Sequence, residues 1–356
     1  MVTVKNQIKV LVVDDSAFMR NAIRSMIISD PELTVVGTAR NGLEALELVK
    51  KLKPDIVTLD VEMPKMDGLE ALRHIMEENP LPVIMVSSLT VDGAKTTLDA
   101  LDLGAVDFLP KNLSDLSVNI VHIKSMLIEK IKNISKTKVK LQKRSASKCT
   151  TTATPKIIAK KAVQFTSSQR MSVITIGTST GGPKALQSII PILPNNIPVP
   201  VLISQHMPPA FTGPFAQRLD QLSQLHVKEA KDGEKIVPGV VYLAPGIGHM
   251  SIIKQGIDKI IKITQNAEYI YKPSVDLMML SVAEVYPGTC LGVILTGMGS
   301  DGLKGMLAIK KSGGRTIAQN EDTCIVYGMP RAVVEAGIAD KIVPLNEIAG
   351  EIVNSI

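Results

Sequence analysis

Asp55-Ile-Val-Thr-Leu-Asp60 is the stretch that decides the fold of the first part of the chain. Its apolar run is typical of a buried strand, and the strand ends in a carboxylate. An earlier run, Ile8-Lys-Val-Leu-Val-Val13, ends in the same way at Asp14 and Asp15. Parallel α/β sheets bind their ligands at the carboxyl ends of the strands. We therefore expect a parallel sheet with three acidic side chains gathered at one edge.

Three neighbouring carboxylates repel one another unless a cation lies nearby. Mg²⁺ suits such a site, because it prefers oxygen ligands and usually takes one or two carboxylates together with phosphate oxygens and water. Two later strands add groups that can hold phosphoryl oxygens: Val83-Ile-Met-Val86 is followed by Ser87, and Ala105-Val-Asp-Phe-Leu109 by Pro110 and Lys111. With an aspartate as the acceptor, the pattern predicts an aspartyl phosphate.

Together with Met63-Pro64-Lys-Met-Asp67-Gly68, these residues resemble the receiver domain of bacterial response regulators over about the first 125 positions. The resemblance implies a doubly wound, flavodoxin-like fold that is phosphorylated by a histidine kinase in the presence of Mg²⁺. One departure is Pro110-Lys111-Asn112, which stands where the family has a Lys-Pro pair. The family's site residues correspond here to Asp60 as the phosphate acceptor, to Asp14, Asp15 and Asp60 as metal ligands, and to Ser87, Lys111 and Phe108 as residues that sense the phosphate.

The length of 356 residues favours two domains, and the charge distribution indicates where they divide. Positions 130 to 170 hold twelve Lys and Arg and no Asp or Glu, whereas positions 171 to 356 hold fifteen basic and fifteen acidic residues. The basic segment is rich in Ser and Thr and has few large apolar residues, so it cannot bury enough surface to fold alone. We expect a receiver domain at 5–125, a flexible linker at 126–169 whose start continues the last receiver helix, and a second domain at 170–356.

The basic segment also fits a tether to nucleic acid or to an anionic membrane. The chain has no Trp and few other aromatic residues to stack on bases, which argues against nucleic acid. No apolar run reaches 18 residues, so no membrane insertion is expected. The three cysteines, Cys149, Cys290 and Cys324, lack the spacing of metal ligands. These features predict a cytoplasmic protein.

A second set of polar residues follows strands of the other domain. Gly177-Thr-Ser179-Thr-Gly181 spells the Gly-x-Ser-x-Gly turn that exposes a nucleophilic serine between a strand and a helix. His206 follows the next apolar run, Val199-Pro-Val-Leu-Ile-Ser204, and could be the base that the serine needs. Asp301 follows a third run, Cys290-Leu-Gly-Val-Ile-Leu295, and could orient the histidine.

Two other residues compete for these positions. His249 is the second candidate for the base, and Asp276 is the rival carboxylate. The chain order Ser, His, Asp differs from the order Ser, Asp, His of the α/β-hydrolases, so that family is disfavoured. We expect an α/β parallel-sheet domain of another kind.

Longer motifs in the second half are Ile176-Gly-Thr-Ser-Thr-Gly-Gly182, Ser204-Gln-His-Met-Pro-Pro209, Tyr242-Leu-Ala-Pro-Gly246, Pro273-Ser-Val-Asp276, Ile294-Leu-Thr-Gly-Met-Gly299 and Ala318-Gln-Asn-Glu321. In this order they resemble the chemotaxis protein-glutamate methylesterases of the CheB family, and the resemblance spans nearly the whole chain. It implies an esterase site without a cofactor. In that site Ser179 would be the nucleophile, His206 the general base, Asp301 its orienter, and the backbone N–H groups of Met298 and Thr180 the oxyanion donors.

The resemblance implies a phosphorylation-activated enzyme that hydrolyses glutamate γ-methyl esters on chemoreceptors and releases methanol. Some relatives also deamidate receptor glutamines. Its partners would be a chemotaxis histidine kinase and methyl-accepting chemoreceptors, and the unphosphorylated receiver would cover the catalytic mouth. The sequence leaves two alternatives open, a nucleic-acid-binding output domain and a catalytically inactive scaffold.

Overall fold

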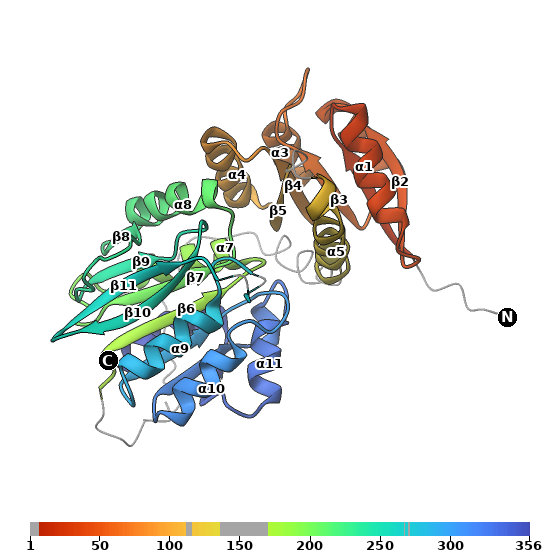
Figure 1. Cartoon of the computed structure of the whole chain (residues 1–356). Coiled ribbons are helices and arrows are strands. Elements are labelled where there is room, and N and C mark those ends of the chain that lie inside the picture. The colour runs from red at the N-terminus through yellow and green to blue at the C-terminus, as the bar shows by residue number, and fades with distance from the viewer. Residues whose placement is uncertain (1–6, 112–115, 136–169, 267, 270) are drawn as a thin grey trace, which may run out of the picture.

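The computed structural model describes residues 7–111, 116–135, 170–266, 268–269 and 271–356 of the 356-residue chain. They form two α/β units, the first coloured red to yellow and the second green to blue in Figure 1. The predicted linker at 126–169 lies outside the described residues beyond Ser135. Up to that residue it is helical, as the last part of helix α5 (Leu116–Ser135).

The first unit is built on a parallel sheet with the strand order β2-β1-β3-β4-β5. The predicted doubly wound fold of the receiver is therefore confirmed. Because β1 and β3 are neighbours, the residues that follow them meet at one edge of the sheet. The strands are β1 (Ile8–Val13), β2 (Leu33–Ala39), β3 (Ile56–Asp60), β4 (Val83–Ser87) and β5 (Asp107–Pro110), and the other helices are α1 (Ala17–Ile28), α2 (Gly42–Leu52), α3 (Gly68–Glu78) and α4 (Val91–Leu103).

Alternate residues along these strands face two layers of helices. Val10 and Val12 pack with α1 and α5, whereas Leu11 and Val13 pack with α2, α3 and α4. In α5 the side chains of Leu127, Ile131 and Ile134 are fully buried at helical spacing. Helix α5 thus covers the sheet past position 125, in the segment whose start was expected to continue the last receiver helix.

The second unit has a larger parallel sheet with the order β14-β13-β12-β6-β7-β9-β8. Its three central strands, β12, β6 and β7, precede Asp301, Ser179 and His206, respectively. The predicted α/β parallel-sheet class is confirmed. The strands are β6 (Val173–Thr178), β7 (Val201–Gln205), β8 (His226–Glu229), β9 (Val240–Leu243), β12 (Cys290–Ile294), β13 (Arg315–Gln319) and β14 (Lys341–Val343).

Helices cover both faces of this sheet. One apolar cluster joins strand residues such as Ile176 and Ile203 to α7 (Gly182–Ile189), α8 (Pro209–Leu222) and α12 (Leu345–Val353). The other joins alternate strand residues to α9 (Val275–Val285), α10 (Leu303–Lys311) and α11 (Met329–Glu335). A separate antiparallel hairpin is formed by β10 (His249–Gln255) and β11 (Asp258–Thr264), and short 3-10 turns lie at Ile190–Ile192 and Glu321–Thr323.

The described helices include none long and apolar enough to cross a membrane.

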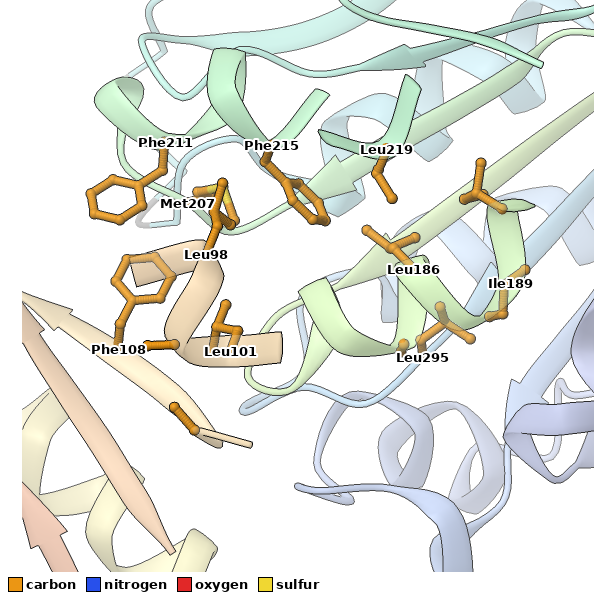
Figure 2. Close-up of a cluster of buried hydrophobic side chains, with 14 of the residues drawn as sticks. Leu98, Leu101, Phe108, Leu186, Ile189, Met207, Phe211, Phe215, Leu219 and Leu295 are labelled. Carbon is orange, nitrogen blue, oxygen red and sulfur yellow. The ribbon is translucent and has the colours of Figure 1, made fainter. Parts of the chain in front are cut away.

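The two units share a buried apolar contact. Helix α4 of the receiver packs against α8 and α7 of the second unit. In the close-up of this cluster, Leu98, Leu101 and Phe108 lie on the receiver side and face Met207 and Phe211 (Figure 2). The side chains of Phe108 and Phe211 are 6% and 0% exposed, so the contact excludes water.

Candidate functional site

The predicted acidic cluster forms at the carboxyl edge of the receiver sheet. Single carboxylate oxygens of Asp14, Asp15 and Asp60 lie within 4.8 Å of one another. Lys111 reaches the same cluster, with Nζ 3.0 Å from Asp14 Oδ2 and 2.6 Å from Asp60 Oδ2. The side chains of Asp14 and Asp60 are almost fully buried, whereas Asp15 is exposed. The structure therefore brings four of the predicted residues together.

Burial shapes the electrostatics of this cluster. It raises the pKa of the Asp60 carboxyl to about 6, with the charge of Asp14 adding to the effect and Lys111 opposing it. Burial also acts to lower the pKa of the Lys111 ammonium, but its hydrogen bond and charge interactions with Asp60 and Asp14 outweigh burial and raise that pKa. One ammonium cannot neutralise three carboxylates. The donor set therefore fits a divalent cation with a preference for oxygen, such as Mg²⁺.

The other two predicted receiver residues lie on the neighbouring strands. Ser87 ends β4, and its hydroxyl donates to the Gly93 carbonyl at 3.2 Å. The backbone N–H of Lys111 donates to the Ser87 carbonyl at 2.6 Å, which ties the end of β5 to the end of β4. Phe108 stacks on Phe211, with ring centroids 4.5 Å apart. It therefore lies at the contact between the two units.

Ser179 and His206 follow paired positions of adjacent strands. Thr178 is the register partner of Gln205, so the next residue on each strand is one of the candidates. The His206 N–H donates to the Thr178 carbonyl at 3.2 Å, and Gln205 Nε2 donates to the Ser179 carbonyl at 3.0 Å. Sheet geometry thus places the serine and the histidine side by side. Among the described residues, no acceptor or donor contacts Ser179 Oγ.

Asp301 pairs with His206. Asp301 Oδ2 lies 2.7 Å from His206 Nε2, and both side chains are about nine-tenths buried. Within the part of the chain that the structure describes, Nδ1 of this ring has no hydrogen-bond partner, so Nδ1 is the atom available to the serine. Burial acts to raise the pKa of the Asp301 carboxyl, but the hydrogen bond and charge of His206 outweigh burial and hold that pKa below its ordinary value. Asp301 is therefore a carboxylate under neutral conditions.

The loop around Ser179 supplies free backbone donors. Within the described chain, the N–H groups of Thr180 and Met298 have no hydrogen-bond acceptor. The loop that carries Met298 lies against the serine, because the Ser179 N–H donates to the Thr296 carbonyl at 3.1 Å and a Cβ placed on Gly297 would lie 3.0 Å from Ser179 Cβ. Two N–H donors beside a hydroxyl are the arrangement that stabilises an oxyanion.

The turn at Ser179 differs from the strained elbow that its Gly-x-Ser-x-Gly sequence suggests. Among the described residues other than glycine, only Lys53 and Lys65 have positive φ, so Ser179 does not. The left-handed position is taken by Gly181, with φ of 77° at the start of α7. The chain reverses at a residue without a side chain, and the strain is avoided at the serine itself.

The two rival residues occupy other places. His249 is fully buried, where Nδ1 accepts the Ser274 N–H at 3.0 Å and Nε2 lies 3.1 Å from the Asn266 carbonyl. Both of its nitrogens are therefore occupied. Asp276 accepts from the N–H groups of Gly302 and Gly305 and makes no contact with His206. The structure favours His206 and Asp301 as the base and the carboxylate.

Tyr271 is a residue of this site whose place was not predicted. Its ring stacks on the His206 imidazole, with centroids 4.8 Å apart and an angle of 12° between the planes. It stands on the loop between β11 and α9, in a stretch without apolar periodicity, so the only signal was its closeness to Pro273-Ser-Val-Asp276. The ring covers the face of the candidate base and restricts its rotation.

A cavity of about 780 Å³ opens beside this site, between the receiver and the second unit. Glu129 and Asn133 of α5 line one side, and Gly299 and Ser300 of the Met298 loop line the other. Met298 and Val326 also belong to the apolar cluster that covers the α1 and α5 face of the receiver. The receiver thus borders the loop that carries the free Met298 N–H.

The first unit has a receiver fold with an acidic cluster of the phosphoacceptor type. The second is an α/β domain with a serine, a histidine and an aspartate at one sheet edge. Together they define a response regulator with a hydrolase-type output domain. Residues 10–119 match the response regulator receiver domain family, and residues 174–352 match the family described as CheB methylesterase. The second match does not support a nucleic-acid-binding or scaffold output.

Individual relatives agree with these matches. The chain is 49% identical to protein-glutamate methylesterase/protein-glutamine glutaminase 1 of Oleidesulfovibrio alaskensis, over 98% of this chain and 99% of that protein. It is 44% identical to protein-glutamate methylesterase/protein-glutamine glutaminase of Pyrococcus abyssi, over 98% of this chain and 94% of that protein. The crystal structure of the Thermotoga maritima CheB methylesterase catalytic domain is similar, with a TM-score of 0.51 and 43% identity over 52% of this chain and 99% of that one. The chain belongs to the CheB methylesterase family.

Proposed function

We propose that this chain is a protein-glutamate methylesterase that is activated by phosphorylation of its own receiver domain. The observation that carries the proposal is the 2.7 Å contact between His206 Nε2 and Asp301 Oδ2 at the sheet edge that also presents Ser179. The names of the curated relatives supply the substrate, a glutamate γ-methyl ester in a protein.

In the proposed reaction Ser179 Oγ attacks the ester carbonyl carbon while His206 Nδ1 takes the hydroxyl proton. Asp301 holds the ring in place and stabilises the imidazolium that forms. The N–H groups of Met298 and Thr180 donate to the oxyanion of the tetrahedral intermediate. As the intermediate collapses, the bond to the methoxy oxygen breaks, and His206 returns its proton to release methanol.

Water then completes the reaction. His206 takes a proton from the attacking water, the acyl bond to Ser179 breaks, and the proton returns to the serine oxygen. The products are a glutamate side chain and free enzyme. The same steps would deamidate a glutamine with ammonia as the leaving group, in keeping with the second part of the relatives' name. The esterase site needs no cofactor for either reaction.

The receiver would accept a phosphoryl group on Asp60 from a histidine kinase. Asp14, Asp15 and Asp60 would hold Mg²⁺, which supplies positive charge to the phosphoryl oxygens when bound. Lys111 and Ser87 would bind the phosphoryl oxygens, because they lie at the ends of the two neighbouring strands. The substrate proteins would be methyl-accepting chemoreceptors, met at their cytoplasmic helices.

Control would act through the contact between the two units. Lys111, which binds Asp60, follows β5, and β5 carries Phe108, which stacks on Phe211 of α8. A phosphoryl group that engages Lys111 would change β5 and weaken this stack. A nearly complete switch from closed to open requires about 5.5 kcal/mol of differential stabilisation, and partial activation requires less.

The test of the activity is methanol release from methylated receptor. Ser179→Ala should lower the rate by at least about 10³-fold, because it removes the nucleophile, while Asp60 still accepts phosphate from a small phosphodonor. Phosphate acceptance is the matched control for folding of the full chain. An Ser179→Ala variant that releases methanol at the parent rate would exclude the serine mechanism.

A further inference from the structure

Helices α9 and α10 begin next to each other. The backbone N–H groups at the start of each helix donate to a carboxylate at the start of the other. Asp301, just before α10, accepts from the backbone N–H groups of Val275 and Asp276 at 2.8 and 2.9 Å. Asp276, in the first turn of α9, accepts from the N–H groups of Gly302 and Gly305 at 2.9 Å each. The two helix starts therefore exchange caps.

This exchange of hydrogen bonds explains how the carboxylates of Asp276 and Asp301 can both be buried at the helix starts. Asp276 is 8% exposed, and the side chain of Asp301 is 7% exposed. The first N–H groups of each helix lack partners within the helix and carry partial positive charge. Each carboxylate satisfies two of these groups on the opposite helix. A further donor, Ser274 Oγ, lies 3.2 Å from Asp301 Oδ1.

The exchange also fixes the position of Asp301 from two sides. The Asp301 carboxylate is held by the start of α9, and its backbone is held because the next residue, Gly302, donates to Asp276. With both ends held, Asp301 Oδ2 is directed at His206 Nε2. Loss of the Asp276 acceptor would free the backbone of Gly302 and with it the Asp301 side chain.

We propose that Asp276 is a positioning residue of the esterase site, which acts on catalysis through Asp301 and not through its own contact with substrate. The inference rests on the proposed function. It predicts an effect on the chemical step, because a displacement of about 1 Å at a catalytic group can lower a rate by roughly 10²-fold. It predicts little effect on KM, because the hydrogen bonds of the Asp276 carboxylate go to the backbone at the start of α10.

The experiment measures kcat and KM for methanol release by the full chain, with Mg²⁺ and a saturating small phosphodonor so that receiver control does not limit the rate. Asp276→Ala should lower kcat by roughly 10- to 100-fold with KM within about twofold of the parent. Asp276→Asn should stay within about threefold of the parent kcat, because both N–H groups donate to the single oxygen Oδ1, which asparagine keeps. Asp276→Ser, with a shorter acceptor, should fall between them.

Asp340 offers a matched control in the same domain. Its carboxylate accepts from the Thr316 N–H at 2.9 Å at the beginning of β13, the end of the sheet away from Ser179. Asp340→Ala should lower the melting temperature without lowering kcat. If Asp276→Ala does not fold, the order of kcat among the parent, Asp276→Asn and Asp276→Ser decides the question.

A double-mutant cycle separates positioning from a general structural effect. In an Asp301→Ala background, the further change Asp276→Ala should alter kcat by less than about threefold, because the carboxylate that it positions is gone. Three results would each overturn the inference: parent kcat in Asp276→Ala, an equal loss in Asp276→Asn, or an undiminished loss in the Asp301→Ala background. Failure of the proposed function looks different, since the parent chain itself would then release no methanol.

Discussion

The ring of Phe108 stacks on the ring of Phe211 at a centroid distance of 4.5 Å and an interplanar angle of 14°, across the contact between the receiver and the esterase domain. Phe108 lies three residues before Lys111, which pairs with Asp60. One short strand, β5, thus connects the predicted phosphorylation site to the domain contact. Aromatic pairs of this kind contribute about 0.5–1.5 kcal/mol beyond their buried area. In the proposed mechanism, this stack links phosphorylation to the opening of the enzyme.

Charge reversal at the same contact should release the esterase domain. Arg218 of α8 pairs with Asp99 at 2.8 Å and with Asp102, both on α4 of the receiver. The pairs are partly exposed, so each contributes at most about 1 kcal/mol. Arg218→Asp should therefore raise the unphosphorylated rate of methanol release by roughly fivefold.

The matched control restores the pairing with the charges exchanged. Adding Asp99→Arg and Asp102→Arg to Arg218→Asp should return the basal rate toward that of the parent. A basal rate that Arg218→Asp leaves unchanged would show that this contact does not hold the receiver in place.

Removal of the receiver should also raise the rate of methanol release above that of the unphosphorylated chain. A fragment that begins at Arg170 lacks Glu129 and Asn133, which line the cavity beside the Met298 loop, and also lacks Phe108. We expect it to release methanol faster than the unphosphorylated full chain. Equal or lower activity from a fragment with a cooperative unfolding transition would contradict control by steric cover.

Tyr271 should support the base through its ring and not through its hydroxyl. The ring lies flat on the His206 imidazole, where an aromatic face stabilises the imidazolium formed during catalysis. Tyr271→Phe should keep kcat/KM within about twofold of the parent, whereas Tyr271→Ala should lower it about fivefold, the equivalent of roughly 1 kcal/mol. If both variants lose activity equally, the hydroxyl group carries the effect.

His249 should make the stability of the chain depend on pH. Burial lowers the pKa of its imidazole below the ordinary value of 6.5, and both nitrogens are bonded in the neutral form. Below about pH 6.5 the unfolded chain takes up a proton that the folded chain does not, so this contribution to stability is full above that pH and declines as the pH falls.

The variant His249→Asn isolates this proton, because its amide oxygen can still accept the Ser274 N–H. The melting temperature of the parent should exceed that of the variant at pH 7.5, and the difference should shrink toward pH 5. A difference that stays constant over this range would mean that His249 is not kept neutral by burial.

Sheet topology explains why the sequence could predict which of these residues lie close together. Asp14, Asp60, Ser179, His206 and Asp301 each follow an apolar strand, and parallel strands deliver such residues to one edge without further information. Phe108, Thr180 and Met298 were expected only from the family resemblance, and the places of two further residues were not predicted. Tyr271 stands on a loop, and Arg218 meets Asp99 across 119 positions of sequence and between two domains. Such contacts depend on how folded segments that are distant in the sequence pack against one another. Local apolar periodicity carries no information about that packing.

The last helix of the receiver shows what apolar spacing alone can predict. Helix α5 continues to Ser135, and the apolar positions at helical spacing beyond residue 125 are the reason to expect that the start of the basic segment continues this helix. Leu127 and Ile131 are fully buried against the sheet. The apolar spacing therefore predicted the helix here, within a segment whose composition is basic.

The most direct test of the account is the rate of methanol release from methylated chemoreceptor by the full chain, measured with and without a small phosphodonor and Mg²⁺. We expect the phosphodonor to raise the parent rate by at least about tenfold, or roughly 1.4 kcal/mol. The variant Asp60→Ala should keep the basal rate and lose the stimulation, because it lacks the acceptor but keeps Ser179, His206 and Asp301. Equal stimulation of the parent and of Asp60→Ala would contradict control of the esterase through Asp60.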